Sequence, residues 1–227
     1  MELKRELMQG LGFRKEFDGA QDFDLVLRAA FALQGKEETI AHLKQVLYHW
    51  RCHSASTAEN PQSKRYAYEA GLRAVQDFAD QKGWKLRAEE TRHLGFYRYV
   101  YSADPFTVRE DVGAVGGPVI SRGKIAGGRM DEAGKIFYEN LPTSYSGYLH
   151  RAVLQQDADV LDLRSIRVRE ELRPLFTEIV GVPYVEDPKT GRFDYTTLLT
   201  DADLKLLSIT LGKAIRARGY KLLYLPD

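Results

Sequence analysis

Cysteine is almost absent, because the 227-residue sequence contains a single one and so cannot form an internal disulfide. Such a chain is typical of reducing compartments. No apolar run approaches the ~18 residues that a membrane-spanning helix needs. The charged start, Met-Glu-Leu-Lys-Arg-Glu-Leu, lacks the apolar core of a signal peptide. We therefore expect a cytoplasmic protein without a membrane partner, or one delivered by a route that needs no cleavable signal.

An excess of charge of either sign is also missing. The chain has 33 basic and 32 acidic side chains, for a net charge of +1, which provides no global attraction to nucleic acid or membranes. Neither Gly-x-x-x-x-Gly-Lys-Ser/Thr nor Gly-x-Gly-x-x-Gly after a strand is present, so two common nucleotide-binding motifs are excluded. Hydrophobic residues make up 44%, which is enough for a packed core.

The first part of the chain has helical periodicity. Apolar residues recur at intervals near 3.6 and predict helices over residues 22–33, 36–53 and 63–82. Residues 54–61 between the last two are small and polar and end in proline, as in a loop. We therefore predict a helical accessory region over residues 1–83.

From Trp84 onward the pattern changes to short β-favouring runs mixed with helices. Predicted strands cover 93–101, 136–139, 160–163 and 220–225; predicted helices cover 144–155, 166–180 and 200–218. Residues 116–134 are rich in glycine and without periodicity, and residues 181–197 are expected to form a loop or hairpin. The predicted fold class is α+β, with a catalytic domain over residues 84–227.

The glycine-rich stretch carries Arg122, Lys124 and Arg129. Glycine allows backbone amides to approach a ligand, and successive amides can form a nest for anions. Arginine adds a planar fork that grips phosphate at two points. The stretch is equally compatible with an anion site for a diphosphate and with a solvated surface loop.

A second cation, Arg98, lies between Tyr97 and Tyr99 on the predicted strand, so that it points away from both tyrosines. An inward-facing arginine is costly unless it meets an anion. A ligand phosphate would serve, and so would an internal partner such as Glu139 or Asp162, which is the more common arrangement.

A third group starts at Tyr138 and Glu139 and continues with Tyr145, Tyr148 and His150. An aromatic face can stack on nicotinamide or adenine, and a carboxylate can polarise a ribose hydroxyl. The alternative is that Tyr138 belongs to the core and that Glu139 is a solvated strand end.

A fourth group, His49, Cys52 and His53, has helical spacing that would suit a metal. Such a patch more often ends an amphipathic helix, and no metal is predicted.

The order of these features resembles the RES-domain toxins, which have the ADP-ribosyltransferase fold. The resemblance consists of a Tyr-Arg strand, the segment Gly-Gly-Arg-Met-Asp-Glu-Ala-Gly, the strand Ile-Phe-Tyr, and the run Val-Leu-Asp-Leu. A closing Ala-Arg-Gly-Tyr-Lys-Leu-Leu-Tyr-Leu-Pro completes it, and the whole covers residues 96–226. It implies a mixed, split sheet with flanking helices. Two departures stand out: Met130-Asp131 replaces an aromatic-Asn pair, and no glutamate follows on the next helix. Glu178 and Glu186 are distant candidates for that acid.

The resemblance implies an NAD-consuming enzyme that transfers ADP-ribose or hydrolyses NAD, as a toxin or effector. NAD would be its substrate, and its partners would be a macromolecular acceptor and an antitoxin or immunity protein. The implied catalytic residues are Tyr138 and Glu139, and the implied NAD-binding residues are Arg98, Arg129, Gly127, Gly128 and Tyr148.

Two alternatives remain. The basic glycine-rich loop and the tyrosines could bind nucleic acid. The helix bearing Leu43, Leu47 and Trp50 could bind a protein partner as an adaptor.

Overall fold

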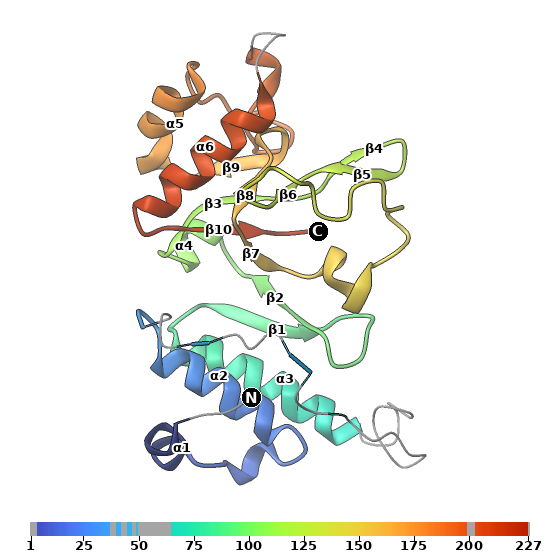
Figure 1. Cartoon of the computed structure of the whole chain (residues 1–227), viewed down its shortest axis with the longest axis vertical. Coiled ribbons are helices and arrows are strands. Elements are labelled where there is room, and N and C mark those ends of the chain that lie inside the picture. The colour runs from blue at the N-terminus through green and yellow to red at the C-terminus, as the bar shows by residue number, and fades with distance from the viewer. Residues whose placement is uncertain are drawn as a thin grey trace. The chain divides into compact units, whose positions relative to one another are not determined.

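The computed structural model describes residues 4–36, 40–41, 45–46, 49, 65–198 and 203–226. It divides the chain into two compact units, Met1–Ser102 and Ala103–Asp227, whose elements are labelled in Figure 1. We call them unit 1 and unit 2 and describe each by itself.

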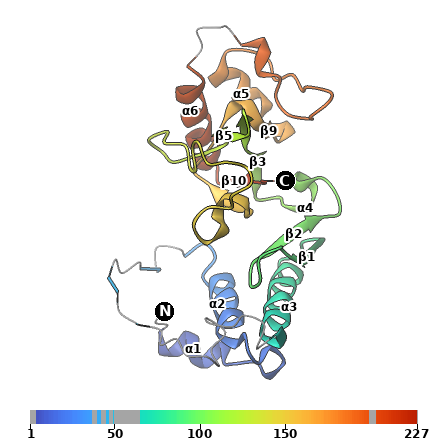
Figure 2. The ribbon, with the colours of Figure 1, turned by 90° about the vertical axis from the view of Figure 1, so that its right-hand side faces the viewer.

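In its described residues, unit 1 has three α-helices and a β-hairpin. Its elements are α1 (Arg5–Leu11), a 3-10 turn (Lys15–Phe17), α2 (Gln21–Ala32), α3 (Arg65–Gln81), β1 (Leu86–Glu90) and β2 (Tyr97–Tyr101). Helices α2 and α3 pack side by side (Figure 2). The helices predicted over 22–33 and 63–82 are confirmed, whereas most of the helix predicted over 36–53 lies outside the described residues.

The hairpin belongs with the helices, because its tyrosines face α3. The Tyr97 hydroxyl donates to the Tyr68 carbonyl at 2.8 Å, and the Tyr99 hydroxyl donates to the Val75 carbonyl at 2.9 Å. The first compact unit therefore extends to Ser102, beyond the boundary predicted after residue 83.

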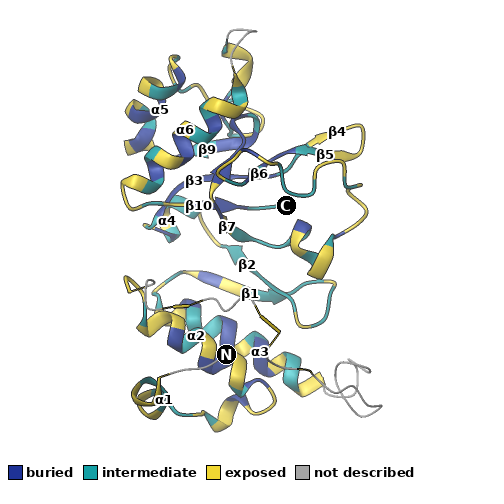
Figure 3. Cartoon of the chain, in the orientation of Figure 1, coloured by how far each residue is buried: buried dark blue, intermediate teal, exposed yellow. Residues whose placement is uncertain are grey.

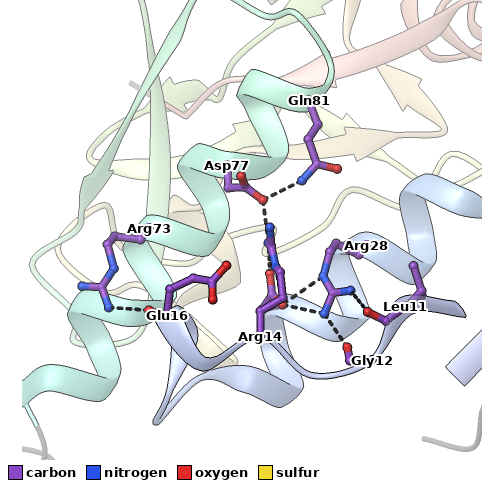
Figure 4. Close-up of polar contacts among 9 residues, drawn as sticks. Leu11, Gly12, Arg14, Glu16, Arg28, Arg73, Asp77 and Gln81 are labelled. Atoms are coloured by element: carbon purple, nitrogen blue, oxygen red, sulfur yellow. Dashed lines mark hydrogen bonds and ion pairs between the residues drawn. The ribbon is translucent and has the colours of Figure 1, made fainter. Parts of the chain in front are cut away.

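A polar network around a buried carboxylate joins the helices of unit 1, and Figure 4 labels Arg14, Arg28 and Asp77 within it. Asp24 on α2 is 1% exposed and accepts hydrogen bonds from Arg14 and Arg28. Arg14 also reaches Asp77 on α3 at 2.6 Å, and Arg28 donates to the carbonyls of Leu11 and Gly12. This network connects α2, α3 and the segment after α1.

Unit 2 is built on a four-stranded sheet with the order β7-β10-β3-β9. Strands β10 and β3 are parallel, and the two outer strands run antiparallel to their neighbours. The strands are β3 (Val112–Gly116), β7 (Gln156–Ala158), β9 (Ile166–Val168) and β10 (Lys221–Tyr224).

Helices α5 (Arg173–Val180) and α6 (Leu204–Ala217) lie against each other beside this sheet, while α4 (Pro105–Val108) contacts β3 (Figure 1). The core lies between the sheet and these helices, where Phe176, Leu211 and Ile215 are fully buried (Figure 3). Asp203 begins α6 as its N-cap by accepting from the Leu206 amide, whereas the predicted capping box placed Asp203 at its last position, inside a helix that opened at residue 200.

Two small antiparallel pairs complete unit 2. Strand β4 (Val119–Ser121) pairs with β5 (Lys124–Gly127), and β6 (Arg129–Met130) pairs with β8 (Val160–Leu161). The unit is therefore α+β, and its glycine-rich stretch consists of strands rather than the predicted loop.

Three other local predictions need correction. The helix predicted from 166 begins only at Arg173, because buried Ile166 and Val168 alternate with Arg167 as a strand requires. Of the strand predicted over 136–139, only Ile136 forms a β-bridge. The helix predicted up to 155 is instead a kinked 3-10 segment, Tyr148–Val153.

One other prediction is confirmed. A bridge between Glu186 and Phe193 makes the segment around 181–197 a hairpin. Among the described residues, no helix is both long enough and apolar enough to cross a membrane.

Candidate functional site

Arg129 is held on a short hairpin of unit 2. Its backbone carbonyl accepts from the Phe137 amide at 2.9 Å, and Met130 bridges to Ile136. A turn closes the hairpin, with an Asp131 oxygen accepting from backbone amides inside it. Because Arg129 and Phe137 are directly opposed, the guanidinium carbon lies 4.0 Å from the centre of the Phe137 ring.

The guanidinium of Arg129 has no acidic partner in the described part of the chain. Its Nε is buried and without a hydrogen bond, and it forms no ion pair. Burial lowers the pKa of Arg129, and the positive charge of Arg151 lowers it further, whereas Tyr138, Tyr224 and Asp159 act in the opposite direction. A desolvated cation on an aromatic ring is strongly attracted to any anion that reaches it.

Two tyrosines lie within the electrostatic reach of Arg129. Burial raises the pKa of Tyr224 on β10 to about 12, while Arg129 lowers it and Tyr138 raises it. Tyr138 has a φ of 61°, a left-handed conformation that is rare outside glycine. The chain thus turns sharply at Tyr138, directly after the residue that supports the guanidinium.

Gly127 and Gly128 precede Arg129 and are required by close packing. A Cβ on Gly127 would lie 2.2 Å from an Asp162 oxygen and 2.5 Å from Arg164 Nη2. Asp162 is buried and pairs with Arg164, which also donates to the Ala126 carbonyl. The Asp162 amide donates to the Gly128 carbonyl at 2.7 Å. A Cβ on Gly128, whose φ is 123°, would lie 2.8 Å from the Gly117 carbonyl oxygen. These contacts fix the backbone that presents Arg129 and explain both glycines without a ligand.

The other two cations of the glycine-rich stretch do not form a phosphate nest. Arg122 and Lys124 are exposed at the tip of the β4–β5 hairpin. The two-residue loop Arg122–Gly123 joins paired Ser121 and Lys124. Both loop residues have positive φ, as in a type I′ turn. The turn chemistry, and not anion binding, accounts for this glycine.

Arg98 lies in unit 1 and has an internal partner. It is paired with Glu89 across the β1–β2 hairpin, with 3.1 Å between Nη2 and Oε2. The partner is therefore the neighbouring strand's carboxylate rather than Glu139 or Asp162. From the same strand, Tyr97 and Tyr99 donate to carbonyls of α3. That Arg98 and Arg129 meet at one ligand stays a prediction, because they belong to different units.

The remaining predicted residues of unit 2 are mostly exposed. Glu139 is exposed just after the turn at Tyr138, and Tyr148 is 77% exposed at the start of the 3-10 segment. Glu178 is exposed on α5, and Glu186 forms an ion pair with Arg173 at 2.5 Å. Structural proximity to Arg129 thus singles out Tyr138 among the predicted catalytic residues.

The structure describes only one residue of the predicted histidine and cysteine group. His49 is exposed, and Cys52 and His53 lie outside the described residues. No cluster of three or more potential metal ligands occurs in the part of the chain that the structure describes.

Sequence reasoning missed three contributions to the site. Tyr224 was read only as part of a strand, and Arg151 was not singled out. Ser146 was read only as part of the helix predicted over 144–155, but its hydroxyl lies 2.8 Å from Nδ1 of His150. The four-residue spacing of Ser146 and His150 was the sequence signal for this contact. Such a spacing brings two side chains together only for some backbone conformations, so the sequence alone could not establish the contact.

Comparison with known proteins gives two partial similarities. The chain is 43% identical over 65 residues to "Uncharacterized protein y4gI" of Sinorhizobium fredii (strain NBRC 101917 / NGR234), covering 29% of this chain and 7% of that protein. It is 38% identical over 82 residues to "O-antigen biosynthesis protein RfbC" of Myxococcus xanthus, covering 36% of this chain and 6% of that protein. The chain thus matches less than a tenth of the length of these curated relatives.

No protein-family model matches the chain. No solved structure matches it either.

Proposed function

We propose that this protein is an NAD-consuming enzyme of the ADP-ribosyltransferase type, which transfers ADP-ribose to an acceptor or hydrolyses NAD. The single observation that carries the proposal is Arg129, a half-buried guanidinium stacked on Phe137 and without an acidic partner in the described residues. Its chemistry suits one phosphate of a dinucleotide diphosphate, gripped through two parallel N–H donors. On this proposal the sheet of unit 2 is an ADP-ribosyltransferase-like split sheet.

The aromatic residues around Arg129 support the same ligand. Tyr138 emerges next to the ring that supports the guanidinium, so it is positioned to pack on the nicotinamide side. Glu139 follows at the exposed turn, where its carboxylate would polarise a ribose hydroxyl. As the bond from the ribose C1′ to the nicotinamide nitrogen breaks, a nearby carboxylate stabilises the positive charge that develops on the sugar.

The direct test is incubation of the purified protein with NAD and chromatographic measurement of released nicotinamide. Arg129→Ala is expected to weaken NAD binding about 10- to 100-fold, as expected for loss of a charged hydrogen-bonded contact. Lys124→Ala is the matched control, because it removes an exposed cation from the same segment. The proposal would be overturned if the wild type released no nicotinamide and showed no binding of NAD that depends on Arg129.

The partial similarity to a protein named for O-antigen biosynthesis makes a nucleotide sugar a useful second ligand. UDP-glucose shares the diphosphate of NAD but lacks nicotinamide. Binding of UDP-glucose in preference to NAD, with the same loss in Arg129→Ala, would keep the diphosphate site and redirect the activity to glycosyl transfer.

Nucleic-acid binding is the second candidate, favoured by exposed Tyr145 and Tyr148 and by the cations at the β4–β5 tip. The hydroxyls of Tyr97 and Tyr99 are bonded to carbonyls of α3, and stacking of bases on these two rings stays a prediction. Binding to a single-stranded oligonucleotide that falls steeply with salt, and that Lys124→Ala weakens, would support this candidate. The adaptor hypothesis concerns Leu43, Leu47 and Trp50, which lie outside the described residues.

A further inference from the structure

Unit 1 contains a hollow of about 640 Å³ whose wall is largely aromatic. It is bounded by the segment before α2, by the first residues of α2 and α3, and by the turn of the β1–β2 hairpin. Five aromatic side chains contribute to the wall: Phe13, Phe23, Tyr66, Tyr68 and Tyr97. Small-molecule sites have volumes of roughly 300–1,000 Å³, so the hollow has the size of such a site.

Two glycines make room for tyrosines of this wall. A Cβ on Gly19 would lie 2.6 Å from Cε2 of Tyr66. Within α3, a Cβ on Gly71 would lie 2.2 Å from the Tyr97 hydroxyl oxygen. Glycine is unfavourable inside a helix, so its presence at position 71 is explained by the close approach of Tyr97. Close packing therefore holds both rings in place without a ligand.

Tyr97 is anchored on two further sides. Its ring stacks on Phe23, with 6.1 Å between the ring centres and 28° between the planes. Its hydroxyl donates to the Tyr68 carbonyl at 2.8 Å, which leaves the ring as the part that a ligand can contact. Burial raises the pKa of Tyr97 to about 12, and the negative charge of Glu90 acts in the same direction, so the ring stays neutral near pH 7.

The charge on the wall of the hollow is negative. Asp18 and Asp22 line it and are exposed, and its described lining residues include no lysine, arginine or histidine. One oxygen of each carboxylate accepts from the backbone amide of the next residue, at 3.1 Å for Gly19 and 2.8 Å for Phe23. Neither carboxylate forms an ion pair with another described residue. Both charges are therefore left to act on a ligand.

Helix capping explains only part of this charge. Asp22 lies in the first turn of α2, where a negative charge stabilises the helix. Asp18 lies before the helix and outside that turn. The arginine nearest along the chain to Tyr66, Arg65, pairs with Glu90 at 2.7 Å. An aromatic wall combined with negative charge suits a cation that is poorly hydrated.

We propose that this hollow binds a small molecule carrying a quaternary ammonium group. Such a group spreads its charge over its methyl groups, packs against aromatic rings and has no N–H to donate. The rings attract the charge through their quadrupoles, while Asp18 and Asp22 attract it at longer range. The inference is independent of the proposed NAD chemistry, because every residue that carries it belongs to unit 1.

The first experiment compares choline with its neutral carbon analogue, in which a tert-butyl group replaces trimethylammonium. The two molecules have nearly the same shape and differ in charge. In titration calorimetry with the full-length chain, choline should bind at least about tenfold more tightly than the analogue. Absence of choline binding, or equal affinity for the two molecules, would overturn the proposal.

Variants of Tyr66, which is 53% exposed, test the role of the ring. Tyr66→Leu keeps an apolar side chain but removes the π-system, and should weaken choline binding about 5- to 30-fold. Tyr66→Phe keeps the ring and should stay within about threefold of the wild type. Tyr145→Leu is the matched control, because Tyr145 is 59% exposed in unit 2 and its loss should leave choline binding unchanged.

Asp22→Asn tests the role of the charge. Asparagine keeps an oxygen that can accept from the Phe23 amide, so the variant removes the charge and retains the local hydrogen bond. Choline binding should weaken about 2- to 5-fold, and the difference from the wild type should shrink as salt is added. Far-UV circular dichroism checks that each variant is folded.

The remaining outcomes also decide the proposal. Equal choline affinity in Tyr66→Leu and the wild type, or an equal loss in Tyr145→Leu, would overturn it. A peptide containing trimethyllysine that binds about tenfold more tightly than choline would replace the small molecule by a protein partner and overturn it as well. If Tyr66→Leu did not fold, the preference for choline over its neutral analogue and the loss in Asp22→Asn would decide in its place.

Discussion

The arginines of this protein differ in whether a carboxylate of the same chain neutralises their charge. Arg98, Arg164 and Arg173 each pair with a carboxylate, whereas Arg129 lies on an aromatic ring and forms no ion pair within the described residues. An arginine that pairs with a neighbouring carboxylate is stabilised by the fold itself. Arg129 lacks that compensation, and an anionic ligand would supply it.

The clearest stability prediction at this scale concerns Asp24. Burial alone would raise the pKa of this carboxyl, but hydrogen bonds from Arg14 and Arg28 lower it below its ordinary value. Its contribution is therefore fully present above the ordinary carboxyl pKa of about 3.9, and it is lost as the pH falls through the lower folded-state value. Asp24→Asn should lower the free energy of unfolding of unit 1 by about 3 kcal/mol at pH 7.

Tryptophan fluorescence during urea unfolding can measure this change, because both tryptophans, Trp50 and Trp84, belong to unit 1. The difference between Asp24→Asn and the wild type should shrink in strong acid. Exposed Asp80 is the matched control, and Asp80→Asn should stay within about 0.5 kcal/mol of the wild type. A pH-independent difference would contradict the ionised state of Asp24.

At the scale of elements, the β4–β5 hairpin shows how glycine can mislead. Glycines and cations together predicted an anion-binding loop, but the pairing of Ser121 with Lys124 makes Arg122 and Gly123 a tight turn. Glycine is favourable there because φ is positive, and Arg122 adopts the same region at a cost. The cation that remains interesting, Arg129, lies on the next strand.

This leads to a prediction for the turn itself. Arg122→Asn should stabilise the protein by about 0.5–1 kcal/mol, because asparagine suits the first position of a type I′ turn better than arginine. Arg122→Val should destabilise it, since β-branched residues disfavour positive φ. Thermal unfolding measures both changes, and NAD binding is the control. If Arg122→Asn weakened NAD binding as much as Arg129→Ala does, the turn would be part of the NAD-binding site.

At the scale of the whole molecule, the two units have separate cores. The buried cluster of unit 2 runs from Ala114 to Tyr224 and contains no residue of unit 1. Unit 1 has its own interior between α2, α3 and the β1–β2 hairpin. Each unit therefore satisfies the physical requirement for independent folding.

We expect a fragment of residues 103–227 to fold alone, with a cooperative urea transition measured by far-UV circular dichroism. Its binding of NAD then tests whether Arg98 is needed. Binding equal to that of the full chain would show that unit 2 suffices, and the predicted role of Arg98 would be wrong. A folded fragment without NAD binding, together with weakened binding in full-length Arg98→Ala, would support that role. Non-cooperative unfolding would contradict the independence of unit 2.

Local patterns in the sequence correctly predicted those elements whose formation depends on nearby residues. Helices α2, α3 and α6 have apolar stripes at helical spacing. Strands β2 and β10 are rich in aromatic and branched residues. In these cases, periodicity and capping act over a few positions, so the chain carries the information within one short stretch.

The tertiary structure alone decided the rest, because the deciding contacts join distant positions. Gly127 is explained by the carboxylate of Asp162, and the environment of Arg129 depends on Phe137 and Tyr224. By itself, the sequence determined an α+β chain with helices first and a cationic, glycine-rich middle. Only the packed structure determined that Arg129, among the described residues, lies on an aromatic ring and not in an ion pair, because pairing depends on distance in space and not on distance along the chain.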